Sequence, residues 1–199
     1  MINKLLKGLL LPSMIGALLS ACASTPSTNF YVLEPLSGLT PSVTKSVNKP
    51  LIGIGPVSMP ALLDRKQIVT RTQNGSVQIA EFHQWASPLK ENVVQALTHN
   101  LAALRPDYLV RTYPWSAFGS VNYRIIVDIL RFDTNPGKSV NLEANWAIMD
   151  EKKQALISNG HSEIEHPFSD ASYPGAVNAL SEILSEFSRE LSLEIGQIN

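Results

Sequence analysis

Cysteine is nearly absent from this chain of 199 residues, in which Cys22 is the only one. A single cysteine cannot form a disulfide within the chain, so the sequence excludes a disulfide-stabilised scaffold in any compartment. A lone cysteine is most often a small buried hydrophobe. The residues that precede Cys22 favour another role, which is described below.

The chain also lacks any cluster of lysine and arginine. Its 16 basic and 17 acidic residues give a formal net charge of −1. A protein that binds nucleic acid generally carries a basic stripe that replaces the counterions of the phosphates. We therefore expect no nucleic-acid partner. The length is that of one domain, and the 13 prolines and 11 glycines mark turns rather than low complexity.

The sequence contains no recognisable catalytic constellation. Nucleophilic catalysis needs an activated Ser, Cys or Lys beside a positioned base, and no Gly-x-Ser-x-Gly motif is present. Gly53-x-Gly55 lacks the third glycine of a nucleotide-binding loop and runs directly into Pro56, so we interpret it as the end of a strand. His83 and His99 are isolated in the sequence. We predict that the protein is not an enzyme and has no catalytic residue.

One short stretch, from His161 to His166, gathers residue types that bind metals. Side chains of a strand alternate between its two faces, so His161, Glu163 and Glu165 would share one face and His166 would lie on the other. The shared face suits a metal ion, and it also suits the solvated side of an edge strand. We favour the second interpretation and predict neither a metal nor a cofactor, apart from covalent lipid on Cys22.

Residues 1–21 have the features of a secretory signal. A basic start precedes an apolar stretch from Leu9 to Leu19, which is too short for a typical membrane span. The sequence Leu-Ser-Ala-Cys that ends at Cys22 resembles a bacterial lipobox. This resemblance implies that the signal is cleaved before Cys22, that the Cys22 sulfur carries a diacylglycerol and that the new amine is acylated. The alternative is an uncleaved anchor with a chance cysteine.

The residues after Cys22 indicate where the anchored protein resides. Two or more acyl chains are enough for stable anchoring in a membrane. Ala23 and Ser24 follow, and neither is aspartate. By resemblance to enterobacterial sorting rules, this favours the periplasmic face of the outer membrane. Residues 22–29 are then a lipidated tether, and residues 30–199 are the folded domain.

A strand, a loop and a hairpin are predicted between residues 51 and 85. An apolar run over 51–55 is closed by Pro56, as in short buried strands. After a loop, residues 68–72 and 77–82 flank an Asn-Gly pair. Asn-Gly between two such runs is typical of a type I′ hairpin turn, which needs a positive φ at both residues.

The rest of the chain predicts two long helices and an antiparallel meander. Ser87 suits the N-cap of a helix and Pro88 its first position. We expect further strands over 30–33, 108–113, 121–129, 140–148 and 155–165, a turn over 133–138, and helices over 88–104 and 173–195. This mixture without strict alternation predicts an α+β fold: a single domain with a largely antiparallel or mixed sheet and two main helices packed on one face.

Several motifs occur in one order in the first half of the chain. They are FYVL at Phe30–Leu33, the GIGPV strand, a Met-Pro loop followed by LLDR, then QIVTR, and a hairpin ending in EFHQWASPL. This series resembles the PqiC (YmbA) family of auxiliary lipoproteins, which serve ABC-type and MCE-protein transport systems between the two Gram-negative membranes. The resemblance extends to the helix ending near Leu104. It implies a periplasm-spanning partner with MCE domains and a phospholipid or other hydrophobic cargo.

The loop after the first apolar run is the candidate partner-binding surface. It contains Leu62, Leu63, Asp64 and Arg65, and Arg71 follows in the next strand. Loops on a rigid scaffold often carry binding residues, and an exposed leucine rimmed by charges suits a protein interface. The alternative is that both leucines cap the core, that Asp64 pairs with Arg65, and that these charges are ordinary surface ion pairs.

Together, these features predict an outer-membrane-anchored periplasmic lipoprotein that is a non-enzymatic component of an MCE/ABC-type intermembrane transport system and contributes to envelope integrity. The expected partners are the MCE-domain protein and the outer membrane, and a homo-oligomer is compatible with the sequence. The alternative is an assembly or pilot lipoprotein that escorts an outer-membrane protein complex.

The anchor is testable by replacing Cys22 with Ser, which removes the sulfur that would carry the diacylglycerol. We expect the Cys22→Ser protein to remain uncleaved or to become soluble. The measurement is its apparent mass and its sedimentation in fractionated envelopes. A variant that still matures and still sediments with the outer membrane would contradict the lipid anchor.

Overall fold

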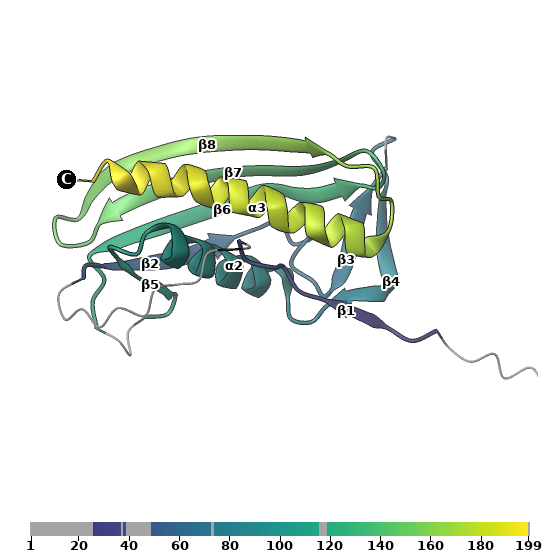
Figure 1. Cartoon of the computed structure of the whole chain (residues 1–199), viewed down its shortest axis with the longest axis horizontal. Helices are drawn as coiled ribbons and strands as arrows, with labels where there is room; N and C mark the ends of the chain where they lie inside the picture. Colours follow the sequence, from purple (N-terminus) through teal and green to yellow (C-terminus); the bar gives the residue numbers. More distant parts are fainter. Residues whose placement is uncertain (1–25, 37, 39–48, 73, 116–118, 199) are drawn as a thin grey trace, which may run out of the picture.

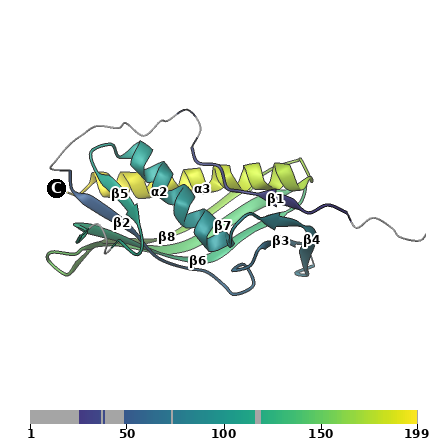
Figure 2. The ribbon, with the colours of Figure 1, turned by 90° about the horizontal axis from the view of Figure 1, so that it is seen from below.

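A computed structural model of the chain describes residues 26–36, 38, 49–72, 74–115 and 119–198. The predicted signal segment 1–21 and the lipidation site Cys22 lie outside the described residues. Within the described part of the chain, eight strands form one mixed sheet, and two helices cover one of its faces (Figures 1 and 2). The predicted α+β fold, with one domain and two main helices on one face of the sheet, is confirmed.

The elements match most of the predicted segments to within a few residues. Their bounds are β1 Asn29–Tyr31, β2 Leu51–Ser58, β3 Gln67–Arg71, β4 Val77–Trp85, α2 Leu89–Leu104, β5 Leu109–Thr112, β6 Tyr123–Asn135, β7 Ser139–Asp150, β8 Ala155–Pro167 and α3 Tyr173–Gly196.

The long strand β6 organises the sheet. Its first half pairs in parallel with β2, its end pairs in parallel with β3, and it pairs with β7 in the antiparallel sense along nearly its whole length. β2 and β3 therefore lie end to end along the same edge of β6. The loop that joins them, residues 59–66, leaves the sheet beside the middle of β6. The strands β6, β7 and β8 form the predicted antiparallel meander.

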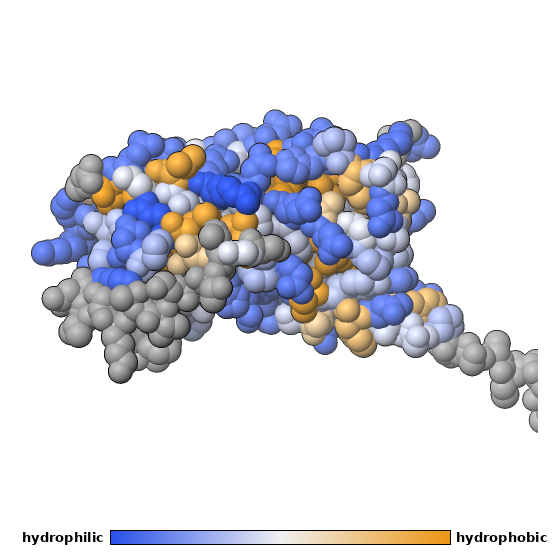
Figure 3. All heavy atoms as spheres, viewed as in Figure 1, coloured by the Kyte–Doolittle hydropathy of each residue, from blue (hydrophilic) through white to orange (hydrophobic). Residues whose placement is uncertain are grey.

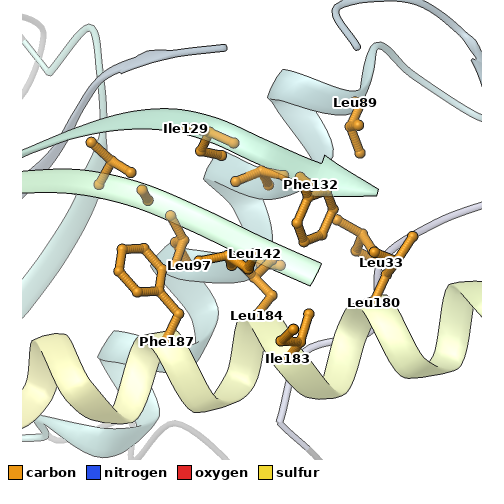
Figure 4. Packing of buried hydrophobic residues seen from close by; sticks show 14 of the residues in the cluster. Leu33, Leu89, Leu97, Ile129, Phe132, Leu142, Leu180, Ile183, Leu184 and Phe187 are labelled. Carbon is orange, nitrogen blue, oxygen red and sulfur yellow. The ribbon is translucent and has the colours of Figure 1, made fainter. Parts of the chain in front are cut away.

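The core lies between the meander and the two helices. Apolar residues recur at helical spacing along α2 and α3 and alternate along β6 and β7, which puts one face of each element inside. Figure 4 shows Leu97 of α2, Leu184 and Phe187 of α3, and Phe132 of β6 in this layer. All four side chains are at most 2% exposed, and each such burial contributes about 1.5–3 kcal/mol.

The prediction that the first apolar strand ends at Gly55 is wrong. β2 continues through Pro56 to Ser58. It pairs with β6 on both sides of a register shift, with Ile54 opposite Ile125 and Val57 opposite Val127. Proline has no amide hydrogen, so it is tolerated in a strand where a bulge removes the need for a ladder hydrogen bond.

The hairpin of β3 and β4 is confirmed, but its predicted type I′ turn is wrong. The amide of Thr72 donates to the carbonyl of Ser76, 2.9 Å away, which closes a longer loop. Gly75 has a φ of +74°, whereas Asn74 does not have a positive φ. The Asn-Gly pair therefore predicted the place of the turn but not its geometry, because loop length selects the turn type.

Two further boundaries differ from the prediction. Helix α2 begins at Leu89, with Pro88 at the N-cap. The Ser87 hydroxyl does not cap the backbone, because it accepts a hydrogen bond from the buried Asn92 side chain at 3.0 Å. Strand β6 continues to Asn135, so Asp133 lies in a strand and is buried rather than in a turn.

The segment after β1 crosses the two helices and is fixed to both. Leu33 is buried in the core. The amide of Leu36 donates to Asn100 Oδ1 of α2 at 2.7 Å, and Asn100 Nδ2 donates to Ser188 Oγ of α3 at 3.0 Å. The amide of Glu34 donates to Ser181 Oγ of α3 at 3.0 Å. The N-terminal segment, α2 and α3 are thus joined through one buried amide side chain.

We expect the Asn100→Ala variant to lower the free energy of unfolding by about 2 kcal/mol, because the Leu36 amide and the Ser188 hydroxyl would lose their buried partner. The neighbouring His99→Ala variant is the control, since His99 is exposed on the same helix. Urea denaturation of the purified proteins measures both. Equal stability of the two variants would contradict the role of Asn100.

Candidate functional site

The candidate loop, residues 59–66, has a defined backbone conformation. The amides of Leu63 and Asp64 donate to the carbonyl of Pro60 at 2.8 and 3.2 Å, which makes one tight turn. The loop is closed at its other end by the amide of Trp85, which donates to the carbonyl of Lys66 at 2.6 Å. Since Trp85 is itself buried, the core holds the loop at the junction of β2 and β3.

Neither leucine of the loop is freely exposed. Leu63 is 5% exposed and belongs to the core. Leu62 is half-buried and packs against that core, as does Met59. The leucines therefore cap the core, which was the alternative to an exposed apolar contact. What the loop presents to solvent is Pro60 and Ala61 together with the charged Asp64 and Lys66.

The two charged residues Asp64 and Arg65 do not pair with each other, so this part of the alternative is wrong. Asp64 Oδ2 lies 3.0 Å from Lys90 Nζ of α2, and both side chains are partly exposed. An exposed pair of this kind contributes about 1 kcal/mol at most. Arg65 is half-buried, and its Nε has no hydrogen-bond partner within the described residues. The pairing of Asp64 with Lys90 joins the loop to the start of α2.

Arg71 belongs to a different set of contacts. Its Nε lies 2.6 Å from Oδ2 of Asp133, which is 1% exposed. Arg131 Nε at 3.1 Å and Asn141 Nδ2 at 3.3 Å also donate to this carboxylate. A buried carboxylate needs such partners to offset its desolvation. Arg71 therefore stabilises the sheet. It is the last residue of β3, at the opposite end of that strand from the loop.

A groove that the sequence reasoning missed adjoins the loop. It has a volume of about 420 Å³ and lies between the start of α2 and the ends of β2 and β5. Its lining is Ile54, Gly55, Pro56, Val57, Lys90, Glu91, Val94, Gln95, Thr112 and Tyr113. The groove is apolar along its floor and charged at the α2 rim, where Lys90 also binds Asp64. The loop and the groove form one continuous candidate surface.

Gly53 and Gly55 serve close packing of aromatic rings. A Cβ atom on Gly53 would lie 2.7 Å from the ring of Trp115, and one on Gly55 would lie 2.7 Å from Tyr113 Cβ. Gly55 also has a φ of +126°, which favours glycine. Tyr113 and Trp115 contact each other edge to face. The two glycines thus admit Tyr113, which lines the groove, and Trp115, which packs against Tyr113. Sequence alone does not reveal this packing.

The histidines of β8 lie on opposite faces, as the alternation predicted. His161 contacts Asn145 Oδ1 at 2.9 Å and Glu143 Oε1 at 3.7 Å, whereas His166 Nε2 lies 2.6 Å from Glu186 Oε2 of α3. Within the described residues, no group of three or more His, Cys, Asp or Glu side chains is placed to hold a metal ion.

His83 serves packing at the start of α3. Its Nδ1 lies 2.7 Å from the Tyr31 hydroxyl, and its ring stacks on Tyr173 at a centroid distance of 3.9 Å. Burial, with a smaller contribution from Tyr173, raises the pKa of Tyr31. His99 is exposed on α2. None of the helices in the described ranges is long and apolar enough to cross a membrane.

Comparison with known proteins identifies relatives along nearly the whole chain. A family model described as ABC-type transport auxiliary lipoprotein component matches residues 31–192. The intermembrane transport lipoprotein PqiC of Escherichia coli strain K12 is 23% identical over 181 residues, which cover 90% of this chain and 93% of that protein. The PqiC protein of Shigella flexneri matches to the same extent.

Solved structures share the fold. A crystal structure of an uncharacterized protein is 21% identical with a TM-score of 0.72, and it covers 85% of this chain and 99% of its own. Protein XCC0632 from Xanthomonas campestris is 15% identical with a TM-score of 0.64, and it covers 85% of this chain and 98% of its own.

Substitution of a buried residue of the loop should lower the free energy of unfolding more than substitution of an exposed, charged one. We expect Leu63→Ala to lower the free energy of unfolding by about 2–4 kcal/mol, because it leaves a cavity in the core. Asp64→Ala should cost less than about 1 kcal/mol, because its ion pair is exposed. Urea denaturation measures both, and equal costs would show that Leu63 is not a core residue.

Proposed function

Since this chain belongs to the family of ABC-type transport auxiliary lipoprotein components, we propose that it is a non-enzymatic component of an intermembrane transport system, lipid-anchored through Cys22 at the periplasmic face of the outer membrane. The observation that carries this proposal is the match to intermembrane transport lipoproteins over 90% of the chain. Those relatives are named for transport rather than for a reaction.

The described N-terminal segment fits an anchored protein. The chain enters the domain at β1, pairs with β4, and is then held by α2 and α3 through Leu36 and Asn100. A pull on the tether would therefore act on the core of the domain rather than on a loose arm. This supports a domain that keeps a defined position close to its membrane.

The partner we propose is a periplasm-spanning protein with MCE domains, as the family resemblance implies. The loop 59–66 and the adjoining groove are the surface that would receive it. The apolar lining residues of the groove suit an apolar segment of the partner, and Lys90, Glu91 and the neighbouring Asp64 place charges along its α2 edge. An apolar centre with a polar rim is the usual build of a protein interface.

In this role the protein would dock or stabilise the outer end of a conduit for phospholipid or another hydrophobic molecule, and it would thereby contribute to envelope integrity. Self-association is compatible with the role, because copies arranged around such a conduit would each present the same surface. The chemistry would consist of binding and positioning, without bond formation in the cargo.

Affinity capture from solubilised envelopes tests the proposal. We expect the lipidated wild-type protein to retain an MCE-domain protein, and the Asp64→Arg, Tyr113→Ala double variant to retain at least tenfold less. Both residues are exposed, so the melting temperature should change little. The control is the Glu165→Arg, Leu156→Ala double variant, which makes the same kinds of change at exposed positions of β8.

Two outcomes would contradict different parts of the proposal. Capture of a barrel or secretin with no MCE-domain protein would favour the alternative role as an assembly or pilot lipoprotein. Equal capture of an MCE-domain protein by the double variant and the wild type would show that the partner binds elsewhere on the domain.

A further inference from the structure

The first strand of the domain exposes apolar side chains that the core does not use. Phe30 is 63% exposed and Val32 is 47% exposed. The residues between and after them face inward, since the Tyr31 hydroxyl binds His83 and Leu33 is buried. Figure 3 shows apolar side chains on the part of the surface where Figure 1 places β1.

Strand β4, the neighbour of β1, adds to this surface. Asn29–Tyr31 pairs in parallel with His83–Trp85. Nearer the hairpin, Ile79 is 46% exposed and Val77 is 36% exposed. We define the β1–β4 patch as Phe30, Val32, Val77 and Ile79.

The β1–β4 patch lies at one end of the long axis of the molecule. Figures 1 and 2 show the start of β1 and the β3–β4 hairpin at this end, and the C-terminus of α3 with the turn between β7 and β8 at the other. The hairpin lies beside the end of β6, because Arg71 and Asn74 line a surface hollow together with Asn135, the last residue of β6.

The length of the tether limits how far this end can be from a membrane. Seven peptide steps separate Cys22 from Asn29 in the sequence, and a fully extended chain of that length spans at most about 25 Å. A lipid on Cys22 therefore keeps the start of β1, and with it the nearest part of the patch, within about that distance of the lipid surface. This step rests on the lipid anchor of the proposed function.

We propose that the β1–β4 patch rests on the lipid surface, with its four apolar side chains at the boundary between headgroups and acyl chains. Apolar side chains at this depth add to the hold of a covalent lipid anchor. The opposite end, with the turn between β7 and β8, then points away from the membrane. The lipid anchor thus sets the orientation of the domain as well as its location.

The charges near the patch balance each other, so we expect the contact with lipid to depend on the apolar side chains rather than on charge. Arg71 and Arg131 share the buried Asp133, and exposed Lys138 is accompanied by exposed Glu81 and Asp170. This end therefore has no excess of positive charge among its described residues. Docking should depend little on the fraction of anionic lipid, unlike the binding of a polybasic segment.

Fluorescence quenching by lipids tests the proposal in the full lipidated protein. Vesicles of phosphatidylethanolamine and phosphatidylglycerol carry brominated acyl chains, and an environment-sensitive label is attached at Ile79→Cys. The control is Leu156→Cys, an apolar position that is 54% exposed on β8 at the opposite end. We expect at least twofold quenching at position 79 and none at position 156.

A second variant tests whether the quenching depends on the apolar side chains of the patch. Adding Phe30→Ser and Val32→Ser to the labelled protein should abolish most of the quenching at position 79, because these exposed changes remove apolar contact and leave the core intact. Raising the salt concentration should leave the wild-type quenching unchanged. Quenching that survives the double change, or that disappears with salt, would contradict apolar docking.

The outcomes separate docking from anchoring. If the protein floats with the vesicles while positions 79 and 156 are equally unquenched, docking is wrong and the anchor stands. If energy transfer between labels on neighbouring molecules replaces quenching, the patch contacts a second copy and lipid docking is wrong. If the protein fails to float, the anchor itself is contradicted, and docking with it.

Discussion

The packing of the N-terminal segment against the two helices depends on the hydrogen bonds of the buried Asn100 side chain. Its amide accepts a hydrogen bond from the Leu36 backbone and donates one to Ser188, so it joins the N-terminal segment to both helices. An unpaired polar group in such a position would be costly, because the interior offers no water to replace the lost partner. The N-terminal segment is therefore held in one place on the core.

The sheet provides the second constraint. Because β2 and β3 share one edge of β6, the loop between them must leave the sheet at a fixed position, and the buried Leu63 and Trp85 hold it there. The register shift between Ile54 and Val57 falls in the part of β2 that lines the groove. The proposed partner surface would thus rest on elements whose packing is already determined by the core, as loops with a binding role commonly do.

The sequence predicted the meander and both helices, because hydrophobic periodicity reports the type of an element and which side of it is buried. It did not predict that β2 passes through Pro56, since the bulge that tolerates the proline depends on pairing with β6, about 70 residues away in the sequence. The partners of Asp64 and Arg71 were missed for the same reason, because Lys90 and Asp133 come from distant elements. The groove was missed because its lining residues come from β2, α2 and the end of β5, which only the tertiary fold brings together.

The central claim is that this auxiliary lipoprotein acts from a membrane to which Cys22 holds it. The mass of the N-terminal peptide of the protein extracted from envelopes tests that claim most directly. The account predicts a peptide that begins at Cys22 and carries a diacylglycerol on sulfur together with an acyl chain on nitrogen. A peptide that begins upstream of Cys22, or a mature peptide with an unmodified Cys22, would contradict it.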